Sequence, residues 1–214
     1  SQLFENLPAL KDVLGRVRAS WPGPLTVKIR LGSDTSGAEE RFVERIKVIE
    51  DAGVDAITLH VRFFEDKFKR RARHELFQWA TTLTKLPIIA NGDITSPALV
   101  QQNDRLFATV AGLMIGRMAI ARLWIFASWH RPVEVDMGEV WRRLHRYVCE
   151  DFPPEKALRR IRLFSRYYAR NYLFGHHFMV AIDQAPTVED ALIRADAFFA
   201  TNPDVLQDPS MQGL

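Results

Sequence analysis

Polar and glycine residues follow four short apolar segments of the chain, and their types are those of a phosphate-binding site. Glycine lets a phosphate group approach backbone N–H groups, a helix N-terminus adds partial positive charge, and arginine supplies a planar fork of donors. Lysine and histidine within apolar segments need a polar partner, which an anionic or electron-rich ring would provide. These features indicate a site for a phosphate-bearing cofactor. The residues in question are Lys28, His60, Asn91, Gly92, Asp93, Gly116 and Arg117.

Each of these residues also has a simpler interpretation. Gly116 can end a strand without binding anything, and Arg117 can form an ion pair at the surface. A buried histidine such as His60 is more often hydrogen-bonded within the core than bound to a ligand. Spacing alone leaves both interpretations open, although the ending of all four apolar segments in residues of this kind strengthens the case for a common site.

The hydrophobic pattern places these residues at the ends of strands in a repeating strand–loop–helix unit. We expect strands at residues 25–31, 56–61, 87–90 and 111–115, with helices between them. A repeat of about 30 residues is typical of a βα unit. Since such folds gather their functional groups where parallel strands end, we expect an α/β fold whose strand ends meet at one site.

The alternation of strands and helices stops near residue 130, and we expect only helices after it. Helical patterns cover residues 139–150, 155–174 and 187–200, and prolines follow in the final segment. We therefore predict three parts. They are a β/α region at residues 1–130, a small all-α domain at residues 131–201 and a loose tail at residues 202–214.

Composition and charge identify a globular chain. Hydrophobic residues make up 47% of its 214 residues, and the formal charge of +3 decides little about partners. A single cysteine, Cys149, excludes an internal disulfide and fits a reducing compartment. The sequence has no apolar run near the roughly 18 residues of a membrane span, no signal peptide and no metal-ligand spacing. We expect a cytoplasmic protein without a membrane or metal partner.

Two basic segments are candidates for binding RNA. One is the expected surface loop at residues 62–73, and the other is a stripe of arginines that recur every three or four positions and therefore share a helix face. Tyrosines near the stripe would add stacking on bases, but the alternative is a solvated helix face with its tyrosines in the core. The candidate RNA contacts are Arg62, Lys67, Lys69, Arg70, Arg71, Arg159, Arg162, Arg166 and Arg170.

Four motifs together carry a resemblance to a known family. They are Val27-Lys28-Ile29-Arg30-Leu31-Gly32, Leu59-His60-Val61-Arg62, Ile89-Ala90-Asn91-Gly92-Asp93-Ile94 and Leu113-Met114-Ile115-Gly116-Arg117. In this order and spacing they resemble the second half of the tRNA-dihydrouridine synthases. The resemblance implies the second half of a (β/α)8 TIM barrel, with four βα units, followed by a small helical domain that binds tRNA.

The resemblance also implies an activity and its cofactors. Members of the family bind FMN and use NADPH to reduce the C5–C6 bond of uridine in tRNA, which yields 5,6-dihydrouridine. By motif, Lys28 and His60 would contact the flavin ring system, where a lysine can stabilise negative charge on the reduced ring. The ribityl phosphate side would be bound by Asn91, Gly92, Asp93, Gly116 and Arg117.

The chain departs from the family pattern in two ways. The proton-donating cysteine of the family lies in the first half of the barrel, and Cys149 does not correspond to it, so we assign no catalytic residue. The second motif has Val61 where the family usually has a small residue. In addition, four strands do not close a barrel and leave strand edges exposed. We therefore expect a missing N-terminal half or a second copy of the chain as a partner.

Two other functions are compatible with the sequence. The chain would be a different FMN-dependent TIM-barrel oxidoreductase that acts on a small molecule, although the basic helical segment argues against this. Alternatively, it would be a stand-alone remnant that binds RNA or another partner without catalysis. The absence of a matching cysteine keeps that second alternative open.

Overall fold

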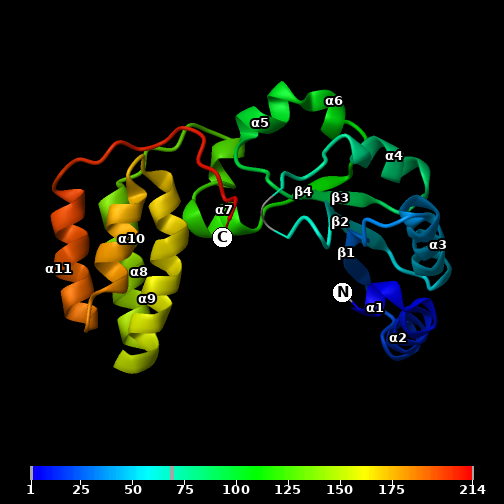
Figure 1. Ribbon diagram of the computed structural model, residues 1–214, viewed down its shortest axis with the longest axis horizontal. Coiled ribbons are helices and arrows are strands. Elements are labelled where there is room, and N and C mark those ends of the chain that lie inside the picture. The colour runs from blue at the N-terminus through cyan, green and yellow to red at the C-terminus, as the bar shows by residue number, and fades with distance from the viewer. Residues whose placement is uncertain (1, 68–69, 214) are drawn as a thin grey trace. The chain divides into compact units, whose positions relative to one another are not determined.

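The computed structural model describes residues 2–67 and 70–213, which form two compact units (Figure 1). The first unit runs to Ile94 and includes Ala98–Gly116. The second consists of Thr95–Pro97 and Arg117–Gln212. This division falls after Gly116, whereas the sequence predicts a domain boundary near residue 130.

A parallel sheet forms the centre of the first unit. Its strands are β1 (Thr26–Gly32), β2 (Ala56–Phe63), β3 (Ile88–Asn91) and β4 (Gly112–Met114), hydrogen-bonded in the order β1-β2-β3-β4. The four strands predicted from the sequence are therefore confirmed. Their parallel, sequential order is consistent with part of a TIM barrel.

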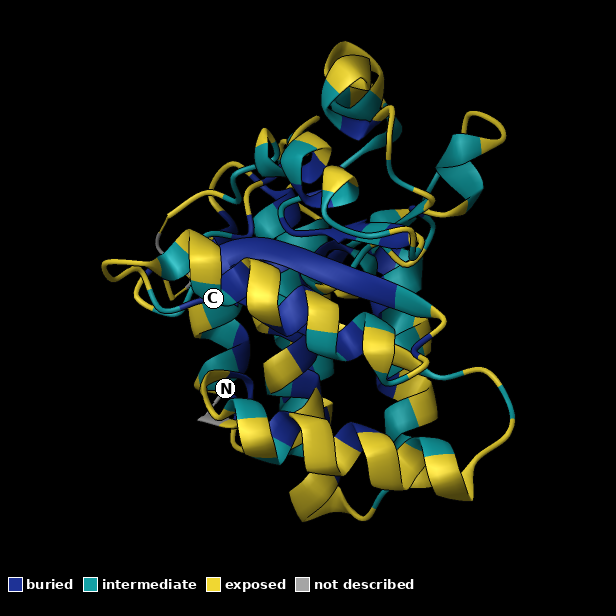
Figure 2. Cartoon of the chain, turned by 90° about the vertical axis from the view of Figure 1, so that its right-hand side faces the viewer, coloured by how far each residue is buried: buried dark blue, intermediate teal, exposed yellow. Residues whose placement is uncertain are grey.

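The two faces of this sheet differ in chemistry because side chains alternate along each strand. One face carries apolar residues such as Leu31, Leu59 and Val61, which are buried and face the helices of the unit. The other face carries Lys28 and His60. The helices are also two-sided, with one side exposed and the other buried (Figure 2).

The helices of the first unit begin and end where the sequence supplies suitable residues. Asn6 caps one helix by accepting a hydrogen bond from the N–H of Ala9 at 3.1 Å, and Gly53 follows another in the left-handed conformation, at φ +74°. They are α1 (Gln2–Glu5), α2 (Leu7–Ser20), α3 (Ala38–Asp51), α4 (Leu76–Thr82), α5 (Pro97–Gln102), which begins in the second unit, and α6 (Asp104–Phe107).

The described part of the second unit contains helices and one isolated bridge between Tyr172 and Val205. Asp136 and Thr187 cap two of the helices by accepting backbone N–H groups at 2.9 and 3.2 Å. The helices are α7 (Arg117–Ala121), η1 (Ala127–Trp129), α8 (Met137–Asp151), α9 (Pro154–Tyr168), η2 (Ala169–Asn171), α10 (Gly175–Asp183) and α11 (Val188–Phe199).

Aromatic residues fill the core of the second unit. Trp141 is fully buried and donates its indole N–H to Ser165 Oγ at 2.9 Å. Tyr168 and Tyr172 are also buried, and the hydroxyl of Tyr168 donates to Met137 O at 2.6 Å. The core interpretation is therefore correct for Tyr168 and Tyr172, whose rings are not available to stack on a base. Tyr167, the third tyrosine near the stripe, is only half-buried.

The sequence predicts one helix over residues 155–174, but the structure divides this segment. Helix α9 ends at Tyr168, a short 3-10 turn follows, and α10 begins at Gly175. The side-chain amide of Asn171 is fully buried and donates to Ala121 O at 2.8 Å and Tyr168 O at 3.1 Å. The helix stops where Asn171 makes the long-range contact to Ala121, which helical periodicity does not reveal.

The segment after residue 201, which the sequence predicts to be loose, is fixed in the second unit. Leu206 donates its N–H to Asn171 O at 2.7 Å, and Arg122 donates to the carbonyl oxygens of Leu206 and Gln207 at 2.5 and 3.0 Å. Met211 is buried. Backbone acceptors for one half-buried arginine therefore hold this segment in place, despite its prolines.

Candidate functional site

The strand register brings several of the predicted cofactor residues onto one face of the sheet. His60 pairs with Arg30 on one side and with Asn91 on the other, so these residues form a row across three strands. Lys28 lies two residues before Arg30 and therefore points to the same face. The prediction that Lys28, His60 and Asn91 share a surface agrees with this register.

His60 is buried and lacks a hydrogen-bond partner for one ring nitrogen. Only 7% of the residue is exposed, and Nε2 has no partner within the described part of the chain. Burial lowers the pKa of His60 from 6.5 to about 4, and the positive charges of Lys28, Arg62 and Arg30 act in the same direction. His60 is therefore a neutral imidazole with an unused polar atom, which a satisfied core histidine would not have.

We expect the protonation of His60 to make folding pH-dependent. Between about pH 4 and 6.5 the unfolded chain binds this proton and the folded chain does not, so stability falls as the pH decreases through this range. The loss is on the order of 3 kcal/mol. Urea denaturation across the range measures it, and His60→Gln should remove that part of the dependence. A His60 ring that titrates near 6.5 by NMR would show that the site is more open than described.

Lys28 is more exposed than the sequence predicts for a residue within an apolar strand. Its side chain lies on the uncovered face of β1, where partial desolvation and the nearby charge of Arg30 lower its pKa. The charge of Lys28 is therefore accessible at the surface of the sheet. It remains available to an anionic group beside His60.

The turn after β3 has two consecutive residues with positive φ, and both belong to the predicted cofactor motif. Gly92 has φ +119° and Asp93 has φ +49°. A Cβ atom on Gly92 would lie 2.7 Å from His60 Cδ2 and 2.9 Å from Ala72 Cβ, so glycine is required both by conformation and by space. Asn91 fixes the start of the turn, because its side-chain amide donates to Met114 O at 2.8 Å.

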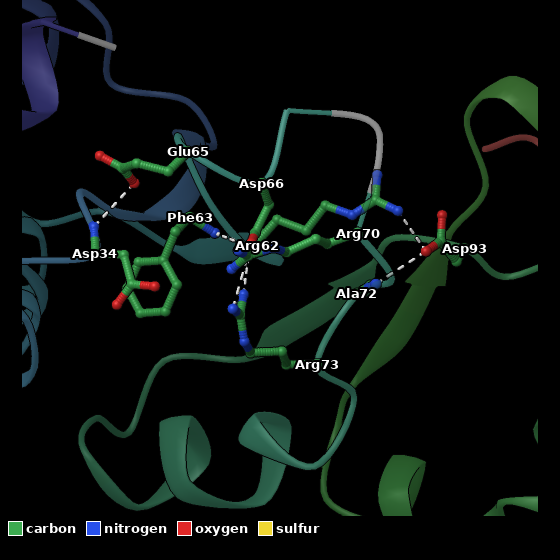
Figure 3. Close-up of polar contacts among 9 residues, drawn as sticks. All are labelled: Asp34, Arg62, Phe63, Glu65, Asp66, Arg70, Ala72, Arg73 and Asp93. Carbon is green, nitrogen blue, oxygen red and sulfur yellow. Dashed lines mark hydrogen bonds and ion pairs between the residues drawn. The ribbon is translucent and has the colours of Figure 1, made fainter. Parts of the chain in front are cut away.

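The carboxylate of Asp93 is engaged by the protein itself. Its Oδ2 accepts hydrogen bonds from Arg62 Nη2 at 2.5 Å and from the N–H of Ala72 at 2.9 Å (Figure 3). Arg62 is fully buried, which corrects its prediction as an RNA contact at the surface. Asp93 and Arg62 thus form a buried ion pair that connects β2 to the turn after β3.

Gly116 and Arg117, the last predicted cofactor residues, fall on either side of the division between the two units. A Cβ atom on Gly116 would have no described atom within 4 Å, and its φ is not in the left-handed range. The packing of the chain therefore does not itself require glycine at this position. Arg117 begins α7 and donates from Nη1 to Met211 O at 2.5 Å within the second unit.

The predicted RNA contacts of the loop after β2 are only partly at the surface. Lys67, Arg70 and Arg71 are exposed, and Lys69 lies outside the described residues. Asp66, which is not among the predicted site residues, has a fully buried side chain and pairs with Arg70 and Arg73. The signal available in the sequence was spacing, because Asp66 lies four residues before Arg70 and seven before Arg73, which allows it to pair with both.

The arginines of α9 and η2 do not form one uniform stripe. Arg159 is exposed, and Arg166 is exposed and pairs with Asp183 at 3.2 Å. Arg162 is turned inward and donates from Nη2 to Ala185 O at 2.5 Å, and Arg170 is half-buried. The exposed positive charge of this region is therefore carried mainly by Arg159 and Arg166 among the four predicted residues.

Other kinds of site receive no support from the described residues. Burial raises the pKa of the Cys149 thiol, and the charges of Glu189 and Glu150 add to this effect, so the thiol is a poor acid or nucleophile. Within residues 2–67 and 70–213 we find no group of three side chains suited to hold a metal ion. Nor is any helix in that part of the chain long and apolar enough to cross a membrane.

Comparisons with known proteins give a consistent result. A family model described as dihydrouridine synthase matches residues 1–185. The tRNA-dihydrouridine synthase B of Yersinia pestis is 28% identical over 212 residues, which cover 93% of this chain and 64% of that protein. The proteins of the same name from Vibrio parahaemolyticus and Escherichia coli are each 29% identical over 210 residues, and the chain covers 63% and 64% of their lengths.

Proposed function

Because the chain belongs to the dihydrouridine synthase family, we propose that it is a portion of an enzyme that reduces uridine in tRNA to 5,6-dihydrouridine, with FMN as cofactor and NADPH as hydride source. The chain spans 63–64% of the length of the curated relatives described above. We propose that the described sheet lies in the second half of a TIM barrel, and that an all-α domain of the chain binds tRNA. A proton-donating cysteine is expected outside these residues.

The observation that carries this proposal is the unpaired ring nitrogen of His60. A buried polar atom without a partner is costly, so the site fits a group that supplies one. The row of His60 and Asn91, with Lys28 on the same face, offers donors and positive charge to a ring with several carbonyl and nitrogen atoms. The residues present therefore fit the polar edge of a flavin.

Each residue would have a distinct task toward this cofactor. When bound, FMN supplies the hydride chemistry of the reaction. Lys28 would stabilise negative charge at the edge of the ring, and neutral His60 would hydrogen-bond to it. Gly116 would let the phosphate approach the backbone, and Arg117 would pair with it. Asp93 would act through the turn that it fixes, since its carboxylate is occupied by Arg62.

We further propose that tRNA contacts the exposed basic residues of both units. These are Lys67, Arg70 and Arg71 in the first unit and Arg159 and Arg166 in the second. Arginine and lysine side chains bind RNA phosphates mainly by charge, so this contact would be sensitive to salt. Arg162 is removed from the set because its guanidinium is engaged with a backbone carbonyl.

Replacing Arg159 and Arg166 together by glutamine is expected to weaken tRNA binding without unfolding the chain. Both side chains are exposed, so their loss costs little stability, whereas each lost phosphate contact reduces the slope of log K against log salt by about 0.7 to 1. A filter-binding titration across salt concentrations measures the slope. Arg16→Gln, in an exposed pair of α2, is the matched control. An unchanged slope in the double variant would exclude this face as an RNA surface.

The proposed reaction is tested by incubating the full-length protein to which this portion would belong, with the proposed proton-donating cysteine, together with FMN, NADPH and a tRNA transcript that lacks modifications. Reduction adds two hydrogen atoms to uridine, so digestion and mass spectrometry should detect dihydrouridine. Transcript that is bound but remains unreduced would contradict the enzymatic proposal. That result would instead support the non-catalytic RNA-binding alternative that the sequence leaves open.

A further inference from the structure

The basic loop, defined as residues 64–67 and 70–75, is folded around a buried carboxylate. The side chain of Asp66 is fully buried, accepts the N–H of Phe63 at 2.9 Å and pairs with Arg73 and, at 3.5 Å, with Arg70 (Figure 3). Burial alone would raise the pKa of Asp66, but the hydrogen bonds from Arg73 and Phe63 and the charges of both arginines lower it below its usual range. Asp66 therefore remains an ionised centre for the loop.

The end of the basic loop is fastened to the turn after β3 by two hydrogen bonds, one from Ala72 and one from His74. Asp93 Oδ2 accepts the N–H of Ala72 in addition to the guanidinium of Arg62. His74 donates from Nε2 to Gly92 O at 2.7 Å. Because one carboxylate oxygen serves both the loop and the buried arginine, the loop does not move away without disturbing the turn.

The two sides of this assembly carry different polar groups. Toward the inside, Nε and Nη1 of the fully buried Arg62 lack hydrogen-bond partners within the described residues, as does Nε2 of His60. Toward solvent, Arg70 exposes 67% of its side chain, and Lys67 and Arg71 are exposed as well. The basic loop therefore borders the turn after β3, which is the proposed cofactor turn (Gly92 and Asp93), and it presents positive charge at the surface.

We propose that Asp66 and Asp93 are positioning residues that hold the basic loop against the cofactor turn, so that the RNA backbone and the cofactor stabilise each other's binding. Asp66 gives the loop its shape, and Asp93 connects the loop to the turn. This inference rests on the proposed function, because it takes FMN and tRNA as the two ligands. The coupling is reciprocal, so each ligand increases the affinity for the other by the same factor.

Two nearly isosteric variants test the proposal. Asp93→Asn tolerates the left-handed backbone of this position but no longer neutralises Arg62, and Asp66→Asn removes the charge that Arg70 and Arg73 share. Asp51→Asn, which removes an exposed pair with Lys47 on α3, is the control. Circular dichroism establishes that each variant is folded.

The first measurement needs no ligand. Cleavage by trypsin after Lys67, Arg70 and Arg71, identified by mass spectrometry, serves as the measure of local opening of the loop. We expect the initial cleavage rate to rise about tenfold in Asp66→Asn and in Asp93→Asn, because each loses a charge-assisted hydrogen bond. Asp51→Asn should behave like the unaltered protein. Equal protection in all variants would overturn the fastening of the loop.

The second measurement is the dissociation constant of FMN, from flavin fluorescence, with and without an unmodified tRNA transcript. We expect tRNA to lower this constant about fivefold in the unaltered protein and in Asp51→Asn, and to have no effect in Asp66→Asn or Asp93→Asn. Coupling that persists in the two variants, or is absent from the unaltered protein, would refute the proposal. If the unaltered protein binds neither ligand, the proposed function fails, and cleavage by trypsin still decides whether the carboxylates fasten the loop.

Discussion

Replacing Gly175 by alanine is expected to destabilise the second compact unit by about 4 kcal/mol, enough to unfold it under mild denaturing conditions. A Cβ atom at this position would lie 1.7 Å from the carbonyl oxygen of Ala169 and 2.7 Å from its carbon. Neither atom is able to move easily, because the buried amide of Asn171 fixes the 3-10 turn that contains Ala169. Urea denaturation followed by tryptophan fluorescence, to which the buried Trp141 of this unit contributes, measures the loss.

The matched control for this prediction is Gly15→Ala. Gly15 lies within α2, and a Cβ atom there would have no described atom within 4 Å. Alanine is the better helix former by about 0.5 to 1 kcal/mol, so this variant should be slightly more stable than the unaltered chain. A Gly175→Ala variant as stable as the unaltered chain would mean that α10 does not begin against Ala169 as described.

Replacing Gly92 by alanine is expected to destabilise the first unit by about 3 kcal/mol and to displace His60. The backbone at φ +119° strains any residue with a Cβ atom, and that atom would contact the His60 ring and Ala72 closer than van der Waals distance. The variant should also open the basic loop, because Ala72 belongs to it. Urea denaturation and the rate of tryptic cleavage within residues 67–71 measure the two effects.

Gly112→Ala serves as the control for this second prediction. Gly112 lies in β4 of the same sheet, its φ is not left-handed, and a Cβ atom would have no described atom within 4 Å. We expect its stability to change by less than about 1 kcal/mol. Equal stability of the Gly92 and Gly112 variants would contradict the close approach of the turn to His60.

The parts of the site that the sequence predicts are those governed by local patterns. Apolar runs that end in polar residues locate β1 to β4, and a parallel sheet then places His60 beside Asn91 by register alone. Gly92 marks the turn after β3 in the sequence, because few residues other than glycine readily adopt a left-handed backbone conformation. These features depend on neighbours in the chain or on one strand pairing.

The parts that the sequence does not predict depend on contacts between distant segments. Arg62 reads as a surface charge next to other basic residues, but its guanidinium is buried, where Asp93 in the turn after β3 neutralises it. Arg162 likewise finds a carbonyl acceptor at Ala185. Alternation and charge spacing do not encode such partners.

The most direct test of the central claim, that the strand ends hold a phosphate-bearing flavin, is a titration of the purified protein with FMN followed by its visible spectrum. We compare the unaltered protein with Gly116→Ala and Gly112→Ala, because both glycines have open space around them and differ in their proposed distance from the phosphate. The proposal predicts a shifted, saturable flavin spectrum that Gly112→Ala retains and Gly116→Ala weakens about tenfold or more. A protein that leaves the spectrum of FMN unchanged, or one whose affinity is equal in both variants, would contradict it.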